Sequence, residues 1–148
     1  MNENNENLAE IRHSFAHLLA AAVLEIYPDT LNTIGPAIDN GFYYDFEFSA
    51  PLSENDLEKI ESKMRELLPS WSTFSKVEIA QDEALSEYSD NDYKQELIKE
   101  IADKGEVITL YTVGNFTDLC RGGHAENPNI DITPDSFKLD RIAGAYWR

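Results

Sequence analysis

Residues 8–27 read LAEIRHSFAHLLAAAVLEIY, and this stretch decides the fold. Apolar residues recur along it at helical spacing, at Leu8, Ile11, Phe15, Leu18, Ala22 and Ile26. That spacing predicts an amphipathic helix, which Pro28 ends near Tyr27. At about 100° per residue, the opposite side carries His13 and His17 beside Ala20, Ala21 and Leu24. We therefore expect a helix buried on two faces, with the histidines next to small residues that leave open space.

Antiparallel strands and further helices are expected after this helix. Asp39-Asn40-Gly41 is typical of a tight hairpin turn, which needs positive φ at its centre, and joins strands at 34–38 and 42–48. Ser53 is expected to cap a second amphipathic helix. Further along, the pattern predicts a strand at 74–79, two short helices within 82–102, a strand at 107–113, mostly loop over 114–134 and an extended segment at 136–147.

This order predicts an α+β fold, in which an antiparallel sheet packs with helices and the histidine-bearing helix lines a cleft. We expect one domain over residues 8–148, preceded by a disordered stretch at 1–7. No run of residues is apolar enough to span a bilayer, and the polar start is not a secretory signal. The single cysteine forms no internal disulfide, which fits a cytoplasmic protein.

The charge balance is strongly acidic. There are 28 acidic against 12 basic residues, and the net charge of −16 repels nucleic acid at long range. Four of the basic residues lie late in the chain, at Arg121, Lys138, Arg141 and Arg148. Any phosphate contact is expected there, with most affinity for a nucleic acid coming from outside this chain.

The residues best suited to chemistry fall into two compact motifs. All three histidines and the one cysteine occur as His13-x3-His17 on the helix and Cys120-x3-His124 in a glycine-rich loop. An i,i+4 pair places both imidazoles on one helix face, and a loop can fold over that face. The four side chains suit either a tetrahedral metal site or a metal-free hydrolytic site. Half-buried histidines and a small core cysteine are the alternative, but the pooling of all four residues favours a site.

Other candidates are weaker by themselves. Asp118 has the alternative of a loop carboxylate that accepts from backbone amides, and Lys94 that of a solvated surface lysine. Arg121 is followed by two glycines that let backbone amides approach a substrate oxygen, although a plain flexible loop is equally consistent with them. Tyr44 and its neighbour Tyr43 are also typical of ordinary strand packing.

Five blocks of sequence occur in an order that identifies a resemblance. They are residues 12–19 (RHSFAHLL), 34–36 (IGP), 39–45 (DNGFYYD), 118–124 (DLCRGGH) and 144–148 (GAYWR). Together they resemble the second N-terminal domain of bacterial threonyl-tRNA synthetases, which is related to the editing domain of alanyl-tRNA synthetases. The match covers roughly residues 8–148. The family continues past the last block, so Arg148 is expected to be a boundary and not a natural end.

The resemblance implies an α+β editing fold with catalytic residues in one cleft, at His13, His17, Lys94, Asp118, Cys120 and His124. It also suggests that Tyr44 and Arg121 bind substrate. The family loop usually has proline where this chain has Gly123, so the placement of His124 is less constrained here. The family's small leading domain, its ATP-dependent ligase domain and its anticodon-binding domain have no counterpart in this sequence.

The implied reaction is hydrolysis of the ester in serine-charged tRNA(Thr). His13 and His124 would deprotonate water, His17 and Cys120 would shape the pocket, and Lys94 would stabilise the oxyanion or a ribose oxygen. Asp118 would orient a histidine or bind the serine amino group. No cofactor is expected, because the threonyl branch is regarded as metal-free, although the alanyl branch resembles a zinc site with His13, His17, Cys120 and His124 as candidate ligands. The alternatives are a free-standing zinc-dependent ester hydrolase and a non-catalytic tRNA-binding module.

Overall fold

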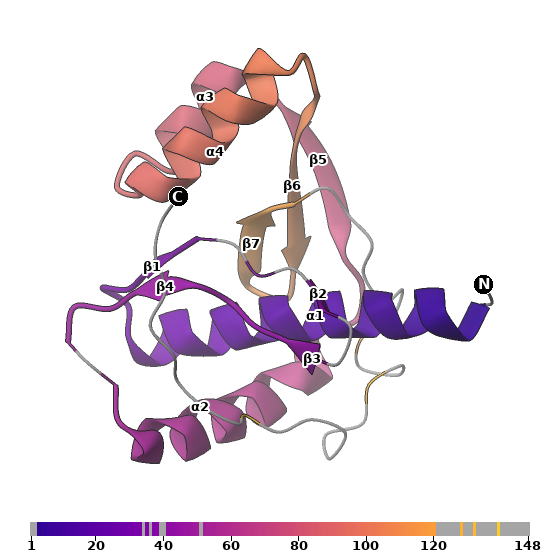
Figure 1. The fold of residues 1–148 in the computed structure, drawn as a ribbon, viewed down its shortest axis with the longest axis vertical. Helices are drawn as coiled ribbons and strands as arrows, with labels where there is room; N and C mark the ends of the chain where they lie inside the picture. The colour runs from indigo at the N-terminus through magenta and orange to yellow at the C-terminus, as the bar shows by residue number, and fades with distance from the viewer. Residues whose placement is uncertain are drawn as a thin grey trace.

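A long helix, α1 (Glu3–Ile26), runs through the middle of the molecule (Figure 1). The computed structural model describes residues 3–33, 35, 37–38, 41–50, 52–120, 128, 132 and 139. The helix begins at Glu3, five residues before the predicted start at Leu8. From Ser14 to Val23 nearly every side chain is buried, as expected for a helix covered on two faces.

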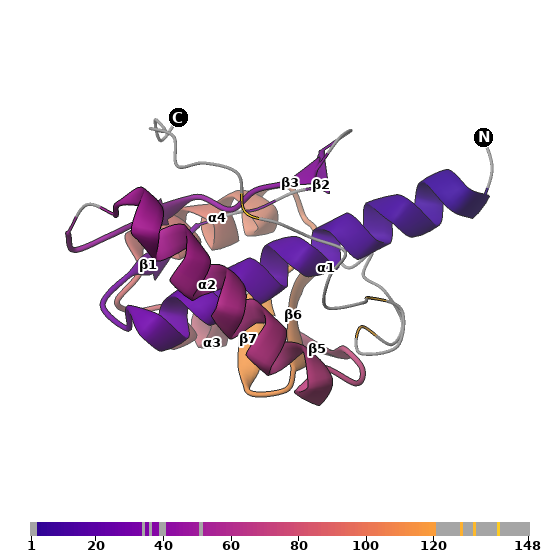
Figure 2. The same ribbon diagram turned by 90° about the horizontal axis from the view of Figure 1, so that it is seen from below.

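Helix α2 (Glu54–Leu67) covers one face of α1 (Figure 2). It starts as predicted after Ser53, whose backbone N–H donates to the Asp56 carboxylate at 2.8 Å. Ile60 and Met64 are fully buried and join Phe15 and Leu18 of α1 in the larger of two hydrophobic clusters. A short 3-10 turn, η1 (Leu68–Ser70), then brings in the buried Trp71 of the same cluster.

The predicted hairpin forms, but as two short ladders. Strand β2 (Ala37–Ile38) pairs with β3 (Gly41–Phe42) across the expected turn, and β1 (Leu31–Asn32) pairs with β4 (Phe46–Glu47). Between the ladders the strand geometry is interrupted around Tyr44, while Thr33 N–H still donates to Asp45 O at 3.0 Å. The alternation holds, since Tyr44 is buried and Tyr43 is exposed. The interruption turns the Tyr44 hydroxyl toward polar partners.

A three-stranded antiparallel sheet lies on the other side of α1 (Figure 1). Its order is β5 (Ser75–Ile79), β6 (Ile108–Val113), β7 (Phe116–Leu119). The third strand corrects the prediction that residue 114 begins a long loop. Val113 pairs with Phe116 across Gly114 and Asn115, and Gly114 has φ of 57°. A glycine at the first position of a two-residue turn is a hairpin signal that the sequence carried.

Helices α3 (Gln81–Glu87) and α4 (Asp92–Asp103) lie between β5 and β6 in the chain, as the two predicted short helices. Ala84, Ile98 and Ile108 form a second, smaller hydrophobic cluster under them. The fold is thus α+β, with antiparallel sheets packed against helices as predicted. Across the described residues, no helix combines the length and apolar character needed to cross a membrane.

The packing of α2 on α1 predicts a stability effect. Met64 has no exposed surface, so Met64→Ala should lower the free energy of unfolding by about 2–5 kcal/mol, through lost burial and a residual cavity. The exposed Ser62 of the same helix supplies the control, because Ser62→Ala should change it by less than about 0.5 kcal/mol. Urea unfolding of both variants measures this, and equal effects would contradict the packing.

Candidate active site

A cleft of about 480 Å³ lies where α1, the β1–β4 segment, α4 and β7 meet. Its walls include side chains from widely separated parts of the sequence. Among them are His13, His17, Tyr44, Lys94, Asp118 and Cys120. The two hydrophobic clusters lie on either side of the cleft. Tyr44 and residues of α1 belong to the larger cluster, and residues of α4 and β6 belong to the smaller one. The polar side chains of the cleft therefore lie between the two hydrophobic clusters, and we call them the polar strip.

Asp118 is the most heavily partnered residue of the cleft. It is the third residue of β7 and is only 1% exposed. Its Oδ1 lies 2.7 Å from Lys94 Nζ, and its Oδ2 accepts from the Tyr44 hydroxyl at 2.6 Å. His17 Nδ1 lies 3.2 Å from Oδ2, and Leu119 N–H donates to Oδ1 at 2.9 Å. The carboxylate does accept from a backbone amide, but Asp118 is a buried strand residue and not a loop residue. We call Asp118, together with Lys94, Tyr44 and His17, the hub.

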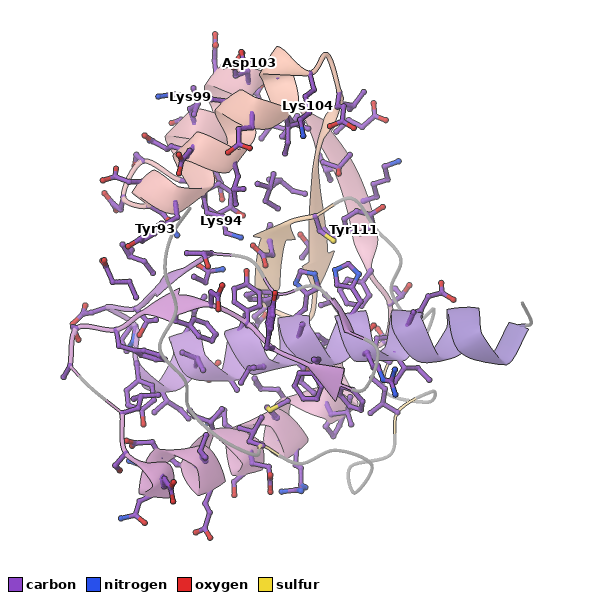
Figure 3. The ribbon with its side chains drawn as sticks, viewed as in Figure 1. Tyr93, Lys94, Lys99, Asp103, Lys104 and Tyr111 are labelled. Carbon is purple, nitrogen blue, oxygen red and sulfur yellow. The ribbon has the colours of Figure 1, made fainter. Side chains whose placement is uncertain are left out.

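Lys94 reaches this hub from the first turn of α4 (Figure 3). It is 1% exposed, so the alternative of a solvated surface lysine is wrong. Besides Asp118, its ammonium group donates to Thr33 O at 2.5 Å and to the Tyr44 hydroxyl at 3.1 Å. An ammonium has three donors, and these three acceptors use them all. The cation is thus fully paired inside the protein.

The charges of the hub explain its proton affinities. Burial alone would raise the pKa of Asp118, but Lys94 and His17 lower it well below its ordinary value, so the carboxylate is ionised. Burial, together with the Asp118 charge, raises the pKa of Tyr44 well above its usual range, so the phenol stays protonated. A neutral tyrosine can donate to Asp118 and still accept from Lys94.

The i,i+4 histidines of α1 lie with their ring centroids 4.9 Å apart. Cys120, directly after β7, places its Sγ 3.5 Å from His13 Nε2. Burial would lower the pKa of His17, but the neighbouring Asp118 and Cys120 outweigh this effect and raise the pKa to about 9. The raised pKa favours the imidazolium form of His17 near neutral pH, and the ring lies beside Asp118 and the rings of Phe74 and Phe116.

These three side chains also suit a metal ion. Ligand atoms of His13, His17 and Cys120 all lie within 4.8 Å of one another. A tetrahedral zinc site brings such atoms somewhat closer, with bonds of about 2.0–2.3 Å, so modest side-chain movement would be needed. Asp118 beside His17 Nδ1 matches the carboxylate that often orients a zinc-bound histidine. The donor set therefore fits zinc as well as a metal-free arrangement.

The structure brings together six of the eight residues proposed from the sequence. Arg121 and His124 lie outside the described residues. Sequence reasoning missed three residues around the hub, Asn32, Thr33 and Asn91, all of them buried. Asn32 Nδ2 donates to the Tyr44 hydroxyl at 3.1 Å, and Thr33 acts through its backbone oxygen, which no sequence pattern reveals.

Comparison with known proteins identifies relatives over nearly the whole chain. The chain is 50% identical over 137 residues to a protein named threonine--tRNA ligase of Borrelia hermsii, covering 93% of this chain and 23% of that protein. It is 48% identical over 146 residues to the threonine--tRNA ligase of Borreliella burgdorferi (99% and 25%). For that of Hyphomonas neptunium the identity is 46% over 145 residues (97% and 22%). The chain spans about a quarter of the length of these relatives, and no family model matches it.

Gly35 offers a test of how tightly Tyr44 is held. A Cβ at Gly35 would lie under 3.0 Å from the Tyr44 ring and from Tyr43 O, so Gly35→Ala must displace the ring. We expect a loss of about 1–3 kcal/mol in the free energy of unfolding. Gly41→Ala is the matched control, since a Cβ there meets nothing within 4 Å. If chemical denaturation shows that both substitutions cost the same, the close approach at Gly35 is not a constraint.

Proposed function

We propose that this chain, which is homologous over nearly all its length to one segment of threonine--tRNA ligases, hydrolyses the ester of serine wrongly attached to tRNA(Thr). One observation carries the proposal. Two histidines and a cysteine stand against a buried Lys94–Asp118 pair, on the wall of a cleft that can admit a substrate. We treat residues 8–148 as the editing domain.

A hydrolytic site of this kind answers a known chemical problem. Serine lacks one methyl group of threonine, and such a difference is worth only about 1–3 kcal/mol in a binding site. A synthetic site that accepts threonine therefore also charges some serine, and a second site has to remove it. The cleft of about 480 Å³ exceeds a seryl group and leaves room for part of the terminal nucleotide.

In the proposed reaction, water adds to the ester carbonyl and its proton passes to His13. His13 is half-buried at the cleft wall, where a water molecule can reach it. The tetrahedral intermediate then expels the ribose oxygen, which takes up a proton, leaving serine and free tRNA. His124 is the second candidate base. Cys120, beside His13, shapes the pocket for the seryl group.

The contacts of the charged residues favour catalytic roles that differ from those expected from the sequence. Lys94 has all three donors engaged, so we assign it to holding Asp118 and Tyr44 in place and no longer to the oxyanion. His17, whose pKa is raised to about 9, would instead supply positive charge near the oxyanion from behind the cleft wall. Asp118 orients His17 and stabilises its positive charge. Tyr44 contacts the substrate through its ring, and Arg121 remains a candidate substrate contact.

A zinc-dependent ester hydrolase is the second candidate, favoured by the cluster of His13, His17 and Cys120. When bound there, zinc would supply an activated water. We propose that zinc is not required. Zinc binding would have to displace a proton from His17, so any affinity for zinc should weaken as the pH falls. The partners we propose are tRNA(Thr) charged with serine and the ligase and anticodon-binding parts of the same synthetase. The reaction would take place in the cytoplasm.

The direct functional prediction concerns amino-acid selectivity. The chain should release serine from Ser-tRNA(Thr) and hydrolyse Thr-tRNA(Thr) far more slowly, because a pocket for serine must reject the extra methyl group. His13→Ala should lower kcat by about 10²–10⁴-fold without unfolding the domain, since His13 is not in the main hydrophobic cluster. Glu25→Ala, on an exposed position of the same helix, is the control. Equal rates on the two esters would refute the editing function.

Metal removal separates the two candidate reactions. After dialysis against a zinc chelator, the serine release should be unchanged, and metal analysis of the active protein should give much less than one zinc per chain. Restoration of a lost activity by added zinc, at one ion per chain, would favour the zinc-dependent hydrolase instead.

A further inference from the structure

We infer that Asn91 is a positioning residue, which fixes helix α4 on strand β1 so that Lys94 meets Asp118 and Tyr44. The consequence for catalysis rests on the proposed function, whereas the positioning itself does not. Asn91 precedes α4, lies outside every motif of the sequence, and is 6% exposed.

Both ends of the Asn91 amide are engaged, and they bind different parts of the chain. Its Oδ1 accepts from the backbone N–H of Lys94 at 3.1 Å, which caps α4. Its Nδ2 donates to the backbone oxygen of Asn32 at 2.9 Å, on β1. One side chain therefore ties the start of the helix that carries Lys94 to the strand whose neighbour, Thr33, accepts from the Lys94 ammonium.

The link continues into the hub through Asn32. The Asn32 amide donates to the Tyr44 hydroxyl at 3.1 Å and lies 3.5 Å from Asp118 Oδ1. Tyr44 and Asp118 are the two side chains that accept from Lys94. Asn91 and Asn32 thus fix the cation and its acceptors relative to one another.

Lys94 needs such support because of where it sits. It is the third residue of α4, close to the positive end of the helix dipole, where a cation is unfavourable. Its helix packs in the smaller hydrophobic cluster, while Tyr44 belongs to the larger one. A small shift between the two clusters would separate the ammonium from its acceptors. Figure 3 shows the Lys94 side chain extending away from α4 across this junction.

An ordinary helix cap would explain only half of these contacts. Capping needs an acceptor, which serine or aspartate supplies as well as asparagine. The Nδ2 donor adds nothing to the cap, and it is this group that reaches β1. The two roles can therefore be separated by substitution.

Asn91→Ser keeps a capping oxygen and removes the donor to Asn32. Asn91→Ala removes both. Ser53→Ala, at the start of α2 and away from the cleft, removes a hydroxyl that donates to the Asp56 carboxylate at 3.2 Å, and is the control for a change at a helix start alone. If Asn91→Ser does not fold, Asn91→Asp, which keeps the shape and the cap, takes its place. Two readouts are measured on the full chain: steady-state deacylation of Ser-tRNA(Thr), and the NMR signal of the Lys94 ammonium, assigned by its loss in Lys94→Met.

We expect Asn91→Ser to shift or broaden the Lys94 signal and to lower kcat roughly 10- to 100-fold, with KM changed less than about twofold. Ser53→Ala should lower the melting temperature and leave the signal and kcat as in the wild type. An unchanged Lys94 signal in Asn91→Ser overturns the inference, whatever happens to kcat. If the wild type releases no serine, the proposed function fails, and the Lys94 signal alone then decides the positioning role.

Discussion

The carboxylate of Asp118 is the constraint on which the site depends. A buried charge is costly unless it is paired and hydrogen-bonded, and the side-chain partners of Asp118 come from separate parts of the chain. Lys94 comes from α4, His17 from α1 and the Tyr44 hydroxyl from the segment between β3 and β4. Each partner must be correctly placed for the charge to be tolerated. One negative charge therefore holds together the elements that form the cleft, and together with Cys120 it raises the pKa of His17.

The position of this polar strip between two hydrophobic clusters gives it a second role. The clusters fix the helices by burial, which is not directional, whereas the hydrogen bonds around Asp118 set how the clusters meet. His13 and Cys120 reach the same wall of the cleft because α1 and the end of β7 carry them there. His13 and Cys120 remain partly exposed, while the charges of Lys94 and Asp118 behind them are buried.

Much of this arrangement could be predicted from particular residues. The apolar stripe through Phe15 and Leu18 correctly placed His13 and His17 on another helix face. The burial of Lys94 was missed, although Ile98 and Ile101 follow it at helical spacing and mark the inward face of α4. The prediction of a loop at Asp118 is wrong, because Gly114 and Asn115 form a tight turn after which Phe116 and Asp118 share the inward face of a strand. The contact between Asn91 and Asn32 joins a side chain to a backbone oxygen, and sequence patterns carry no signal for such pairs.

The most direct test of this account is the coupling between Lys94 and Asp118, measured by a double-mutant cycle in urea. Lys94→Met leaves a buried carboxylate without its cation, and should lower the free energy of unfolding by about 3–5 kcal/mol. The account predicts that the double variant Lys94→Met/Asp118→Leu recovers a large part of this loss, because neither charge then remains uncompensated. Losses that simply add, or a Lys94→Met variant as stable as the wild type, would contradict the claim that this ion pair organises the site.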